Sequence, residues 1–300
     1  MWFKNLQIFR LPKNLDTPIE AVEEALTSSA LQPCGATEPQ KTGWIPPSNV
    51  GTHIHSVNHQ WLTALGVEQR LLPTSIVRQI ANERAKEIEE TQGRKVGRKE
   101  LRDLREALTI ELLPRAFVRR RTTYGWIDPV NGWLVIDSGS QAKAEEYLEY
   151  LRKTTDGFAI SLLKTTLSPS SAMTSWVAAS APPPGFTIDQ DIELRSAENA
   201  LIRYTRHSLE GKEIPEHIGE GKVVTRLGMT WNDRISFVLD EKLQVKRISF
   251  LDILKEEADH QAENEDERFD LDFTLMTGEV AHLLDDLIAA LGGEVEKTES

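Results

Sequence analysis

The chain has 300 residues, of which 39% are hydrophobic and 27% are charged, as in an ordinary globular protein that can bury a core. It contains no stretch of about 18 consecutive apolar residues, which excludes a transmembrane helix. We expect no secretory signal, because the basic and apolar regions of such a signal are missing at the start. Cys34 is the single cysteine and cannot form an internal disulfide, so we expect a cytoplasmic protein.

The charge is unevenly distributed along the chain. In total, 35 Lys and Arg against 47 Asp and Glu give a net charge of −12. Residues 70–122 contain 14 basic and 8 acidic residues, a local charge of +6, whereas residues 251–300 contain 3 basic and 16 acidic residues, a local charge of −13. Such asymmetry is often found in proteins that handle a polyanion. The net charge alone would argue against nucleic-acid binding, and the uneven distribution leaves this function open.

The first third of the chain is predicted to combine two strands with one short helix. Residues 2–11 read as a strand, and Thr17 with Glu20 forms a capping-box signature that predicts a helix starting there. Residues 33–60 are rich in Gly and Pro and are predicted to be mostly loop. Residues 61–68 are predicted to be a strand beside the first one.

A long basic helical stretch follows from residue 73. Apolar residues keep helical spacing, Gly93 and Gly97 interrupt it, and Pro114 ends it, so two tandem helices and one broken helix both fit. A leucine stripe would lie on one side of this stretch. Most of its cations would lie on the other side, namely Arg94, Lys95, Arg98, Lys99, Arg102 and Arg105.

The rest of the chain is predicted to consist mainly of strands. Asn131-Gly132 between apolar runs is a strong hairpin signal, and a Pro-rich linker occupies residues 179–185. The predicted strands cover 117–121, 124–128, 133–137, 158–163, 222–231, 234–239 and 243–250, and the last three form an antiparallel meander. A helix is predicted over 140–153, and an acidic segment, 256–272, precedes a final amphipathic helix.

These elements predict a mixed fold of the α+β or α/β class with antiparallel sheets and long helices. We expect an N-terminal α/β part formed by 1–72 together with 120–180, and a basic helical segment over 73–119. The C-terminal part, 181–300, would contain the meander, the acidic segment and the terminal helix.

Catalytic signatures are scarce, and we expect no enzyme, no cofactor and no metal site. The chain lacks a phosphate-binding P-loop, a dinucleotide-binding glycine motif and a nucleophile elbow. His53, His55 and His59 have metal-like spacing, but no cysteine or carboxylate lies near them in the sequence, so we interpret them as solvent-exposed loop histidines. The acidic residues from Asp252 to Glu267 could be imagined as magnesium ligands, but a run so rich in charge favours a solvated, partly disordered face.

Clustered arginines are the better candidates for a binding site. Several flank Phe117 after Pro114, and others lie at an expected strand end and turn near residue 205. Phosphate contacts need only cations within reach of a regular line of charge. The candidate DNA-binding residues are Arg94, Arg98, Arg115, Arg119, Arg121, Arg203, Arg206 and His207. The chain lacks a zinc-finger or helix-turn-helix motif, which argues against reading of base sequence.

Strand alternation would place three of these arginines, Arg115, Arg119 and Arg121, on one face with Phe117 and would place Arg120 on the other. Phe117 beside four arginines is either part of the core or part of an interface.

Six motifs occur along the chain in an order that is similar to that of a known family. They are Trp2-Phe3-Lys4-Asn5-Leu6, Pro33-Cys34-Gly35, Gly43-Trp44-Ile45-Pro46-Pro47, Leu112-Leu113-Pro114-Arg115-Ala116-Phe117, Gly221-Lys222-Val223-Val224-Thr225 and Leu275-Met276-Thr277-Gly278-Glu279. On these motifs the chain resembles the bacterial recombination-associated RdgC family, over nearly its whole length from Trp2 to Gly293.

The resemblance implies a non-enzymatic protein whose horseshoe-like subunits close into a ring-shaped homodimer. Such a ring binds duplex DNA, and potentially single-stranded DNA, through a positively charged hole without sequence preference. The family is associated with the nucleoid and restrains RecA, in keeping with competition for DNA. By position, Phe117 falls where the family has an apolar contact between subunits, and Arg206 and His207 fall on an extension that touches DNA.

Two segments depart from the family pattern. Residues 65–70 supply one cation where family members tend to carry several, and residues 203–208 are less cationic than is usual. Fewer phosphate contacts predict weaker binding and a shallower salt dependence. Two other functions remain open: a metal-dependent phosphodiester hydrolase that uses the acidic C-terminal cluster, and a protein-interaction module whose acidic tail mimics DNA.

Overall fold

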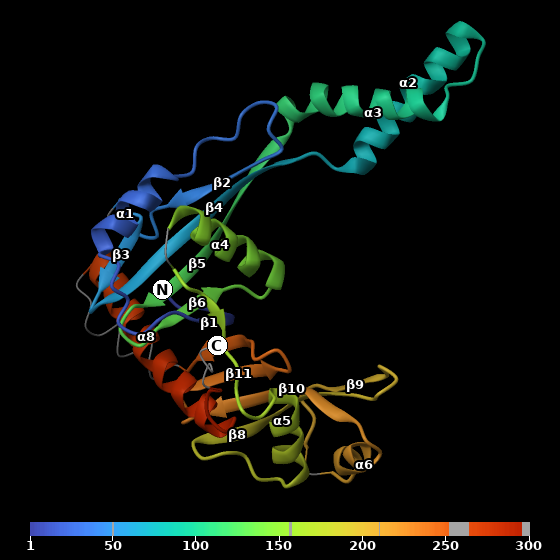
Figure 1. Ribbon diagram of the computed structural model, residues 1–300. Coiled ribbons are helices and arrows are strands. Elements are labelled where there is room, and N and C mark those ends of the chain that lie inside the picture. Colours follow the sequence, from blue (N-terminus) through green and yellow to red (C-terminus); the bar gives the residue numbers. More distant parts are fainter. Residues whose placement is uncertain (50, 156–157, 210, 252–263, 296–300) are drawn as a thin grey trace, which may run out of the picture.

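The computed structural model describes residues 1–300 with the exception of 50, 156–157, 210, 252–263 and 296–300 (Figure 1). Its helices are α1 (Ile19–Ser28), α2 (Thr74–Gln92), α3 (Arg98–Leu112), α4 (Gln141–Thr154), α5 (Pro169–Ala178), α6 (Glu213–Gly219) and α8 (Glu265–Ala290). Its strands are β1 (Leu6–Arg10), β2 (Gln40–Ile45), β3 (Ile54–Val57), β4 (Gln60–Leu71), β5 (Phe117–Asp128), β6 (Trp133–Asp137), β7 (Ser161–Leu162), β8 (Phe186–Arg195), β9 (Leu201–Tyr204), β10 (Val223–Trp231), β11 (Ile235–Asp240) and β12 (Val245–Phe250).

The strands form a 12-stranded antiparallel sheet in the order β2-β4-β5-β6-β1-β12-β11-β10-β8-β9, with β3 beside β4 and β7 beside β1. The first strand, β1, lies in the middle of this order. It pairs with β6 along its whole length and with β12 through Leu6 opposite Val245. The chain start therefore joins the two halves of the sheet, and the predicted mixed fold with an antiparallel sheet is confirmed.

Alternating side chains of the central strands contribute to two cores on opposite faces of the sheet. In β6, Leu134 and Ile136 belong to the core beneath α1 and α4, whereas Trp133 and Val135 belong to the core beneath α8. The helices α5 and α8 share this second core with β8, β10, β11 and β12. The apolar face of the C-terminal half is thus covered, and its polar face is the one that carries the candidate site described below.

One glycine lets α4 pack closely against the sheet. A Cβ atom at Gly125 in β5 would overlap the hydroxyl of Tyr147 in α4. The Tyr147 ring is fully buried, and its hydroxyl contacts that of Thr63 in β4. Burial raises the pKa of this phenol, so it stays protonated and can donate a hydrogen bond. Any side chain at Gly125 would force the helix away from the sheet.

The helices α2 and α3 form an antiparallel hairpin that projects from the sheet and is called the arm below (Figure 1). Gly93, with a φ of 65°, ends α2 in the left-handed conformation that glycine adopts without strain. Val77, Ala81 and Leu108 form a small core between the two helices. Of the two interpretations of the basic stretch, two separate helices is therefore the correct one.

Three predictions about local structure are wrong. The helix α1 begins at Ile19 with Pro18 as its N-cap and without a side-chain cap, so the expected capping box does not form. The strand β4 lies between β2 and β5 rather than beside β1, whereas the Gly- and Pro-rich stretch 33–60 is mostly loop as predicted and contains β2 and β3 in addition. Residues 117–128 form one long strand instead of two, because β5 pairs with β4 without interruption.

Candidate nucleic-acid interface

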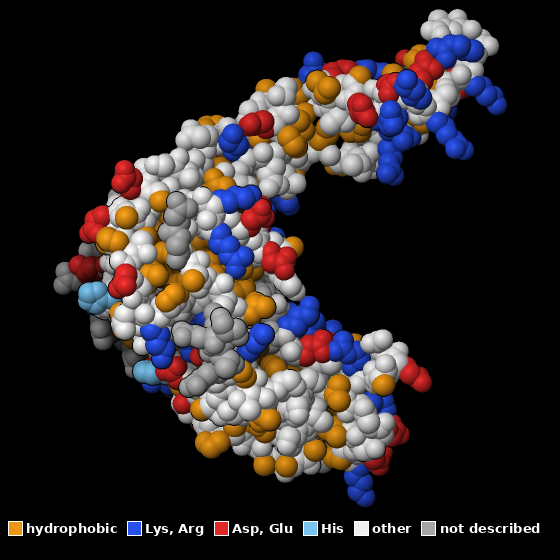
Figure 2. Space-filling model, viewed as in Figure 1, with side chains coloured by type: hydrophobic (Ala, Val, Ile, Leu, Met, Phe, Trp, Pro, Cys, Tyr) orange, Lys and Arg blue, Asp and Glu red, His pale blue; other side chains and the backbone are white. Residues whose placement is uncertain are grey.

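The candidate DNA-binding residues lie at the two ends of a curved molecule. In Figure 1 the molecule forms an arc, with the arm at one end and β9 at the other. Both project toward the side on which the arc is open. Figure 2 shows Lys and Arg side chains gathered along the inner side of the arm and again on the inner edge of the C-terminal half. Two separated groups of cations thus border one concave side.

The arginines at the root of the arm differ in their partners. On β5, Arg119 is exposed and donates to the neutral side chain of Gln69 at 3.3 Å. Arg120 forms an ion pair with Glu68, and Arg121 is half buried and forms an ion pair with Glu146 of α4. A guanidinium that is already held by a carboxylate has fewer donors left for a phosphate. Arg119 is therefore the arginine of this strand best placed for a phosphate.

Arg115 does not share the face of these arginines in the way that strand alternation predicted. It belongs to a short 3-10 turn, Leu113–Arg115, and β5 begins only at Phe117. Pro114 sits inside this turn, where its fixed φ suits helical geometry and not a strand. Arg115 is exposed, but its direction is not set by the β5 alternation.

Phe117 is exposed to 85%, which excludes the alternative of a core position. It stands directly opposite Leu71, which is 40% exposed, at the open ends of β4 and β5. An aromatic ring and a leucine side by side in solvent are unusual unless a partner covers them. This pair presents exposed apolar surface at the root of the arm.

Arg70, counted among the cations of the basic stretch, has a structural role. Its guanidinium donates to the carbonyl oxygens of Cys34, Gly35, Leu113 and Pro114 at 3.1–3.3 Å. These bonds connect β4 to the loop before β2 and to the end of α3. Arg70 thereby fixes the direction in which the arm leaves the sheet.

The tip of the arm carries the remaining candidates from this segment. Arg94 forms two hydrogen bonds of 2.7 Å to Glu100. Arg98 is exposed and occupies the first position of α3, with Lys99 next to it. Cations at a helix N-terminus oppose the helix dipole, so helix stability does not account for this pair. Contact with an anionic partner would account for these two cations.

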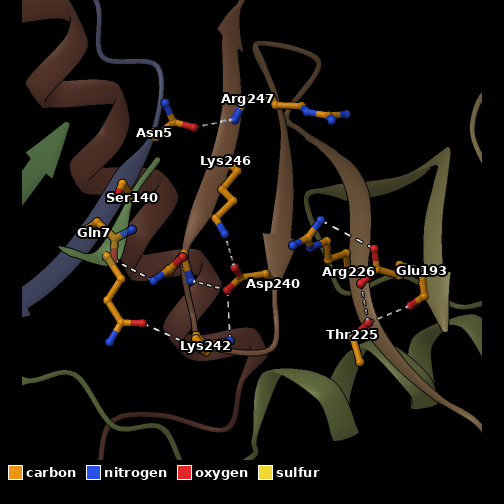
Figure 3. A network of polar contacts seen from close by, with 12 residues as sticks. Asn5, Gln7, Ser140, Glu193, Thr225, Arg226, Asp240, Lys242, Lys246 and Arg247 are labelled. Carbon is orange, nitrogen blue, oxygen red and sulfur yellow. Dashed lines mark hydrogen bonds and ion pairs between the residues drawn. The ribbon is translucent and has the colours of Figure 1, made fainter. Parts of the chain in front are cut away.

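At the other end, a cavity of about 260 Å³ opens on the polar face of the C-terminal half-sheet. Glu193 of β8 lies opposite Arg203 of β9 on one side and opposite Arg226 of β10 on the other. Figure 3 shows Arg226 and Thr225 pointing toward Glu193, and Lys246 of β12 pointing toward Asp240. Cations that line this arginine cavity are Arg203, Arg226, Lys246 and Arg247.

The sequence predicted Arg203 in this group but missed Arg226, Lys246 and Arg247. The sequence feature that could have identified them is the alternation of polar and apolar residues in the meander strands. There the cations follow or precede buried apolar residues such as Leu227 and Val245.

The turn after β9 contains the last two candidates. Arg206 has a φ of 52°, and its backbone N–H donates to Asp191 at 3.0 Å. Arg247 on β12 also has a φ of 52°, and its Nη1 lies 3.9 Å from the same carboxylate. His207 is exposed and stacks at a tilt on Tyr204, with 5.2 Å between the ring centroids. Left-handed arginines are strained and tend to occur at functional sites.

Two of the three histidines depart from the expectation of exposed loop residues, whereas His59 is exposed in the turn between β3 and β4, as predicted. His55 lies on β3, is 8% exposed, and places its Nε2 2.8 Å from Asp270 of α8. His53 places its Nδ1 3.5 Å from Glu23 of α1. Carboxylates that are distant in sequence are thus close in space. Within the described ranges, no three His, Cys, Asp or Glu residues are arranged to hold a metal ion.

Part of the acidic segment belongs to α8. Residues 252–263 lie outside the described residues, whereas Glu265, Asp266 and Glu267 form the first turn of α8. The Asn264 side chain caps this turn by accepting from the Glu267 N–H at 2.9 Å. Carboxylates at a helix N-terminus stabilise the helix through its dipole. These three acids are ordered in a helix, which corrects the expected disordered face at this point.

None of the helices in the described part of the chain combines the length and apolar character needed to span a bilayer.

Comparison with known proteins places the whole chain beside one family. A family model described as "Putative exonuclease, RdgC" matches residues 1–294. The Recombination-associated protein RdgC of Dechloromonas aromatica (strain RCB) is 50% identical over 300 residues, which cover 98% of this chain and 99% of that protein. The protein of the same name from Janthinobacterium sp. (strain Marseille) is 50% identical over 299 residues, covering 99% and 100% of the two chains. The description of the family model names an exonuclease, whereas the names of these two relatives state an association with recombination and no enzymatic activity.

Proposed function

Because the chain belongs to the RdgC family, we propose that this recombination-associated protein binds duplex DNA through its phosphates, without sequence preference and without cleaving it. The observation that carries the proposal is the placement of cations at both ends of one concave side (Figure 2). Contacts to phosphates need cations at reachable positions and carry no base information. Arg98, Arg119, Arg203, Arg206 and His207 would make such contacts, together with Arg94, Arg115 and Arg121 in a supporting role.

We further propose that two copies close into a ring around the DNA. The support is the exposed pair of Phe117 and Leu71, which would be covered by the same region of a second copy. A curved, horseshoe-like subunit with its cations on the concave side suits this assembly. A ring on duplex or single-stranded DNA would restrain RecA by occupying its substrate, and it would place the protein on the nucleoid in the cytoplasm.

The hydrolase alternative has no specific observation in its favour among the described residues. The first-turn acids of α8 are accounted for by helix stabilisation, and the histidines pair with single carboxylates. The DNA-mimic alternative would require the acidic end, not the concave side, to be the binding surface.

A single assay tests the proposal against these alternatives. The purified protein is incubated with linear duplex DNA and Mg²⁺, and the DNA is analysed by gel both for retention and for length. We expect retention of DNA of unchanged length. Shortened DNA would support the hydrolase, and the absence of retention would support a module that binds protein only.

A further inference from the structure

Glu193 is a buried carboxylate held between two arginines. Its side chain is 7% exposed and lies on the middle strand of the three strands β9, β8 and β10. Arg203 Nε donates to its Oε2 at 3.0 Å, and Arg226 Nη1 lies 3.5 Å from the same oxygen. Thr225 Oγ1 donates to Oε1 at 3.1 Å. One acid thus holds an arginine on each side of it in the sheet.

The ionised form of Glu193 is the stable one in this setting. Burial pushes its pKa up, but the hydrogen bonds from Arg203 and Thr225 and the charge of Arg226 outweigh burial, so the pKa lies below the usual range. At neutral pH the carboxylate is therefore charged and keeps both guanidiniums in place.

Both arginines keep donors for a second partner. Their side chains are 51% and 43% exposed, and a guanidinium has five N–H donors, more than Glu193 can accept. They line the arginine cavity together with Lys246 and Arg247. The planar guanidinium groups of two arginines that are held in place can donate parallel hydrogen bonds to the oxygens of a phosphate. Because Glu193 holds these side chains before DNA binds, less side-chain entropy is lost on binding.

We propose that the arginine cavity binds one phosphodiester group of the DNA backbone through Arg203 and Arg226, with Glu193 as the residue that positions them. This inference rests on the proposed DNA binding and names one contact within it. The proposed role of Glu193 predicts an unusual effect of charge on DNA affinity. Removing a negative charge near a polyanion ordinarily strengthens binding, whereas removal of the Glu193 charge weakens it here, because two arginines lose their alignment.

The test compares Glu193→Gln with Glu241→Gln, which removes one charge from the same half-sheet. Glu241 forms an ion pair with Arg195 outside the arginine cavity. Binding of a fluorescent duplex is followed by anisotropy over a range of salt concentrations. We expect Glu193→Gln to bind about fivefold more weakly or worse, and Glu241→Gln to bind as tightly as the wild type or slightly more tightly.

A second variant keeps the test decisive if Glu193→Gln unfolds, as judged by circular dichroism. Arg226→Gln, at a half-buried position, should flatten the log–log salt slope by about 0.9, the value for one lost phosphate contact on duplex DNA. An unchanged slope would overturn the inference.

Removing both arginines provides the sharpest control. In an Arg203→Gln, Arg226→Gln background, Glu193→Gln should no longer weaken binding, because Glu193 has no arginine left to align. If the wild type binds DNA and Glu193→Gln binds it equally tightly or more tightly, this inference is overturned and the proposed function still stands. A wild type that does not bind DNA would overturn both.

Discussion

At the scale of single residues, Asp137 at the end of β6 connects the chain start to the sheet. Its Oδ1 accepts the backbone N–H groups of Lys4 and Asn5 at 3.1 and 2.9 Å. Burial raises the pKa of this carboxyl, and the two hydrogen bonds oppose the rise without cancelling it. The folded state therefore takes up this proton more readily than the unfolded state. The stability that Asp137 contributes is fully present below the unfolded pKa of about 3.9 and is lost as the pH rises through the folded pKa.

Asp137→Asn keeps an acceptor oxygen for both N–H groups and removes the buried charge. We expect the variant to have a higher free energy of unfolding than the wild type at pH 7, with a difference that shrinks toward pH 4. Urea unfolding at both pH values measures it. A variant that is less stable at pH 7, or a difference that is independent of pH, would show that the charge itself is needed.

Single residues also mark the limit of what the sequence could predict. Phe117 was recognisable as unusual because it stands among arginines, and the structure shows it exposed. Glu193 and Arg226 were not recognisable as partners, because only the register of β8 against β10 brings them together. The same holds for His55 and Asp270, which meet where α8 packs near β3.

At the scale of elements, local signals predicted the hairpin at Asn131-Gly132, the C-terminal meander and the two helices of the arm. They failed where glycine has a packing role. Gly43 was read as a loop residue, but it lies in β2, where a Cβ atom would overlap the backbone of Leu31. A glycine that permits close approach and a glycine that breaks a strand look alike in a sequence.

The direction of the arm depends on Arg70 and its four carbonyl partners. Arg70→Met removes these bonds and keeps the bulk of an unbranched side chain. We expect a loss of about 1–2 kcal/mol in the free energy of unfolding. Hydrogen exchange should be faster around Leu113 and Gly35, with the central strands unchanged.

Arg78→Met, at an exposed position of α2, is the matched control and should leave exchange at both places as in the wild type. If Arg70→Met shows the exchange pattern of the wild type, the arm is held in its direction by other contacts.

At the scale of the whole molecule, the proposed dimer would depend on the apolar pair Phe117 and Leu71 at the root of the arm. Phe117→Ala removes a ring that is 85% exposed and so should leave the circular dichroism spectrum unchanged. We expect analytical ultracentrifugation to show a shift from dimer to monomer. Val130→Ala, at a position that is 47% exposed in the turn after β5, should not change the dimer. A Phe117→Ala dimer that persists at low micromolar concentration would place the contact elsewhere.

We propose that the concave side holds DNA by its phosphates. The most direct measurement is the affinity of the wild-type protein for two duplexes of equal length and unrelated sequence, titrated from low to physiological salt. We expect equal affinities for the two duplexes and a steep linear fall of log affinity with log salt, with a slope of about −0.9 for each phosphate contacted. Affinity that is insensitive to salt, or a clear preference for one of the two sequences, would contradict it.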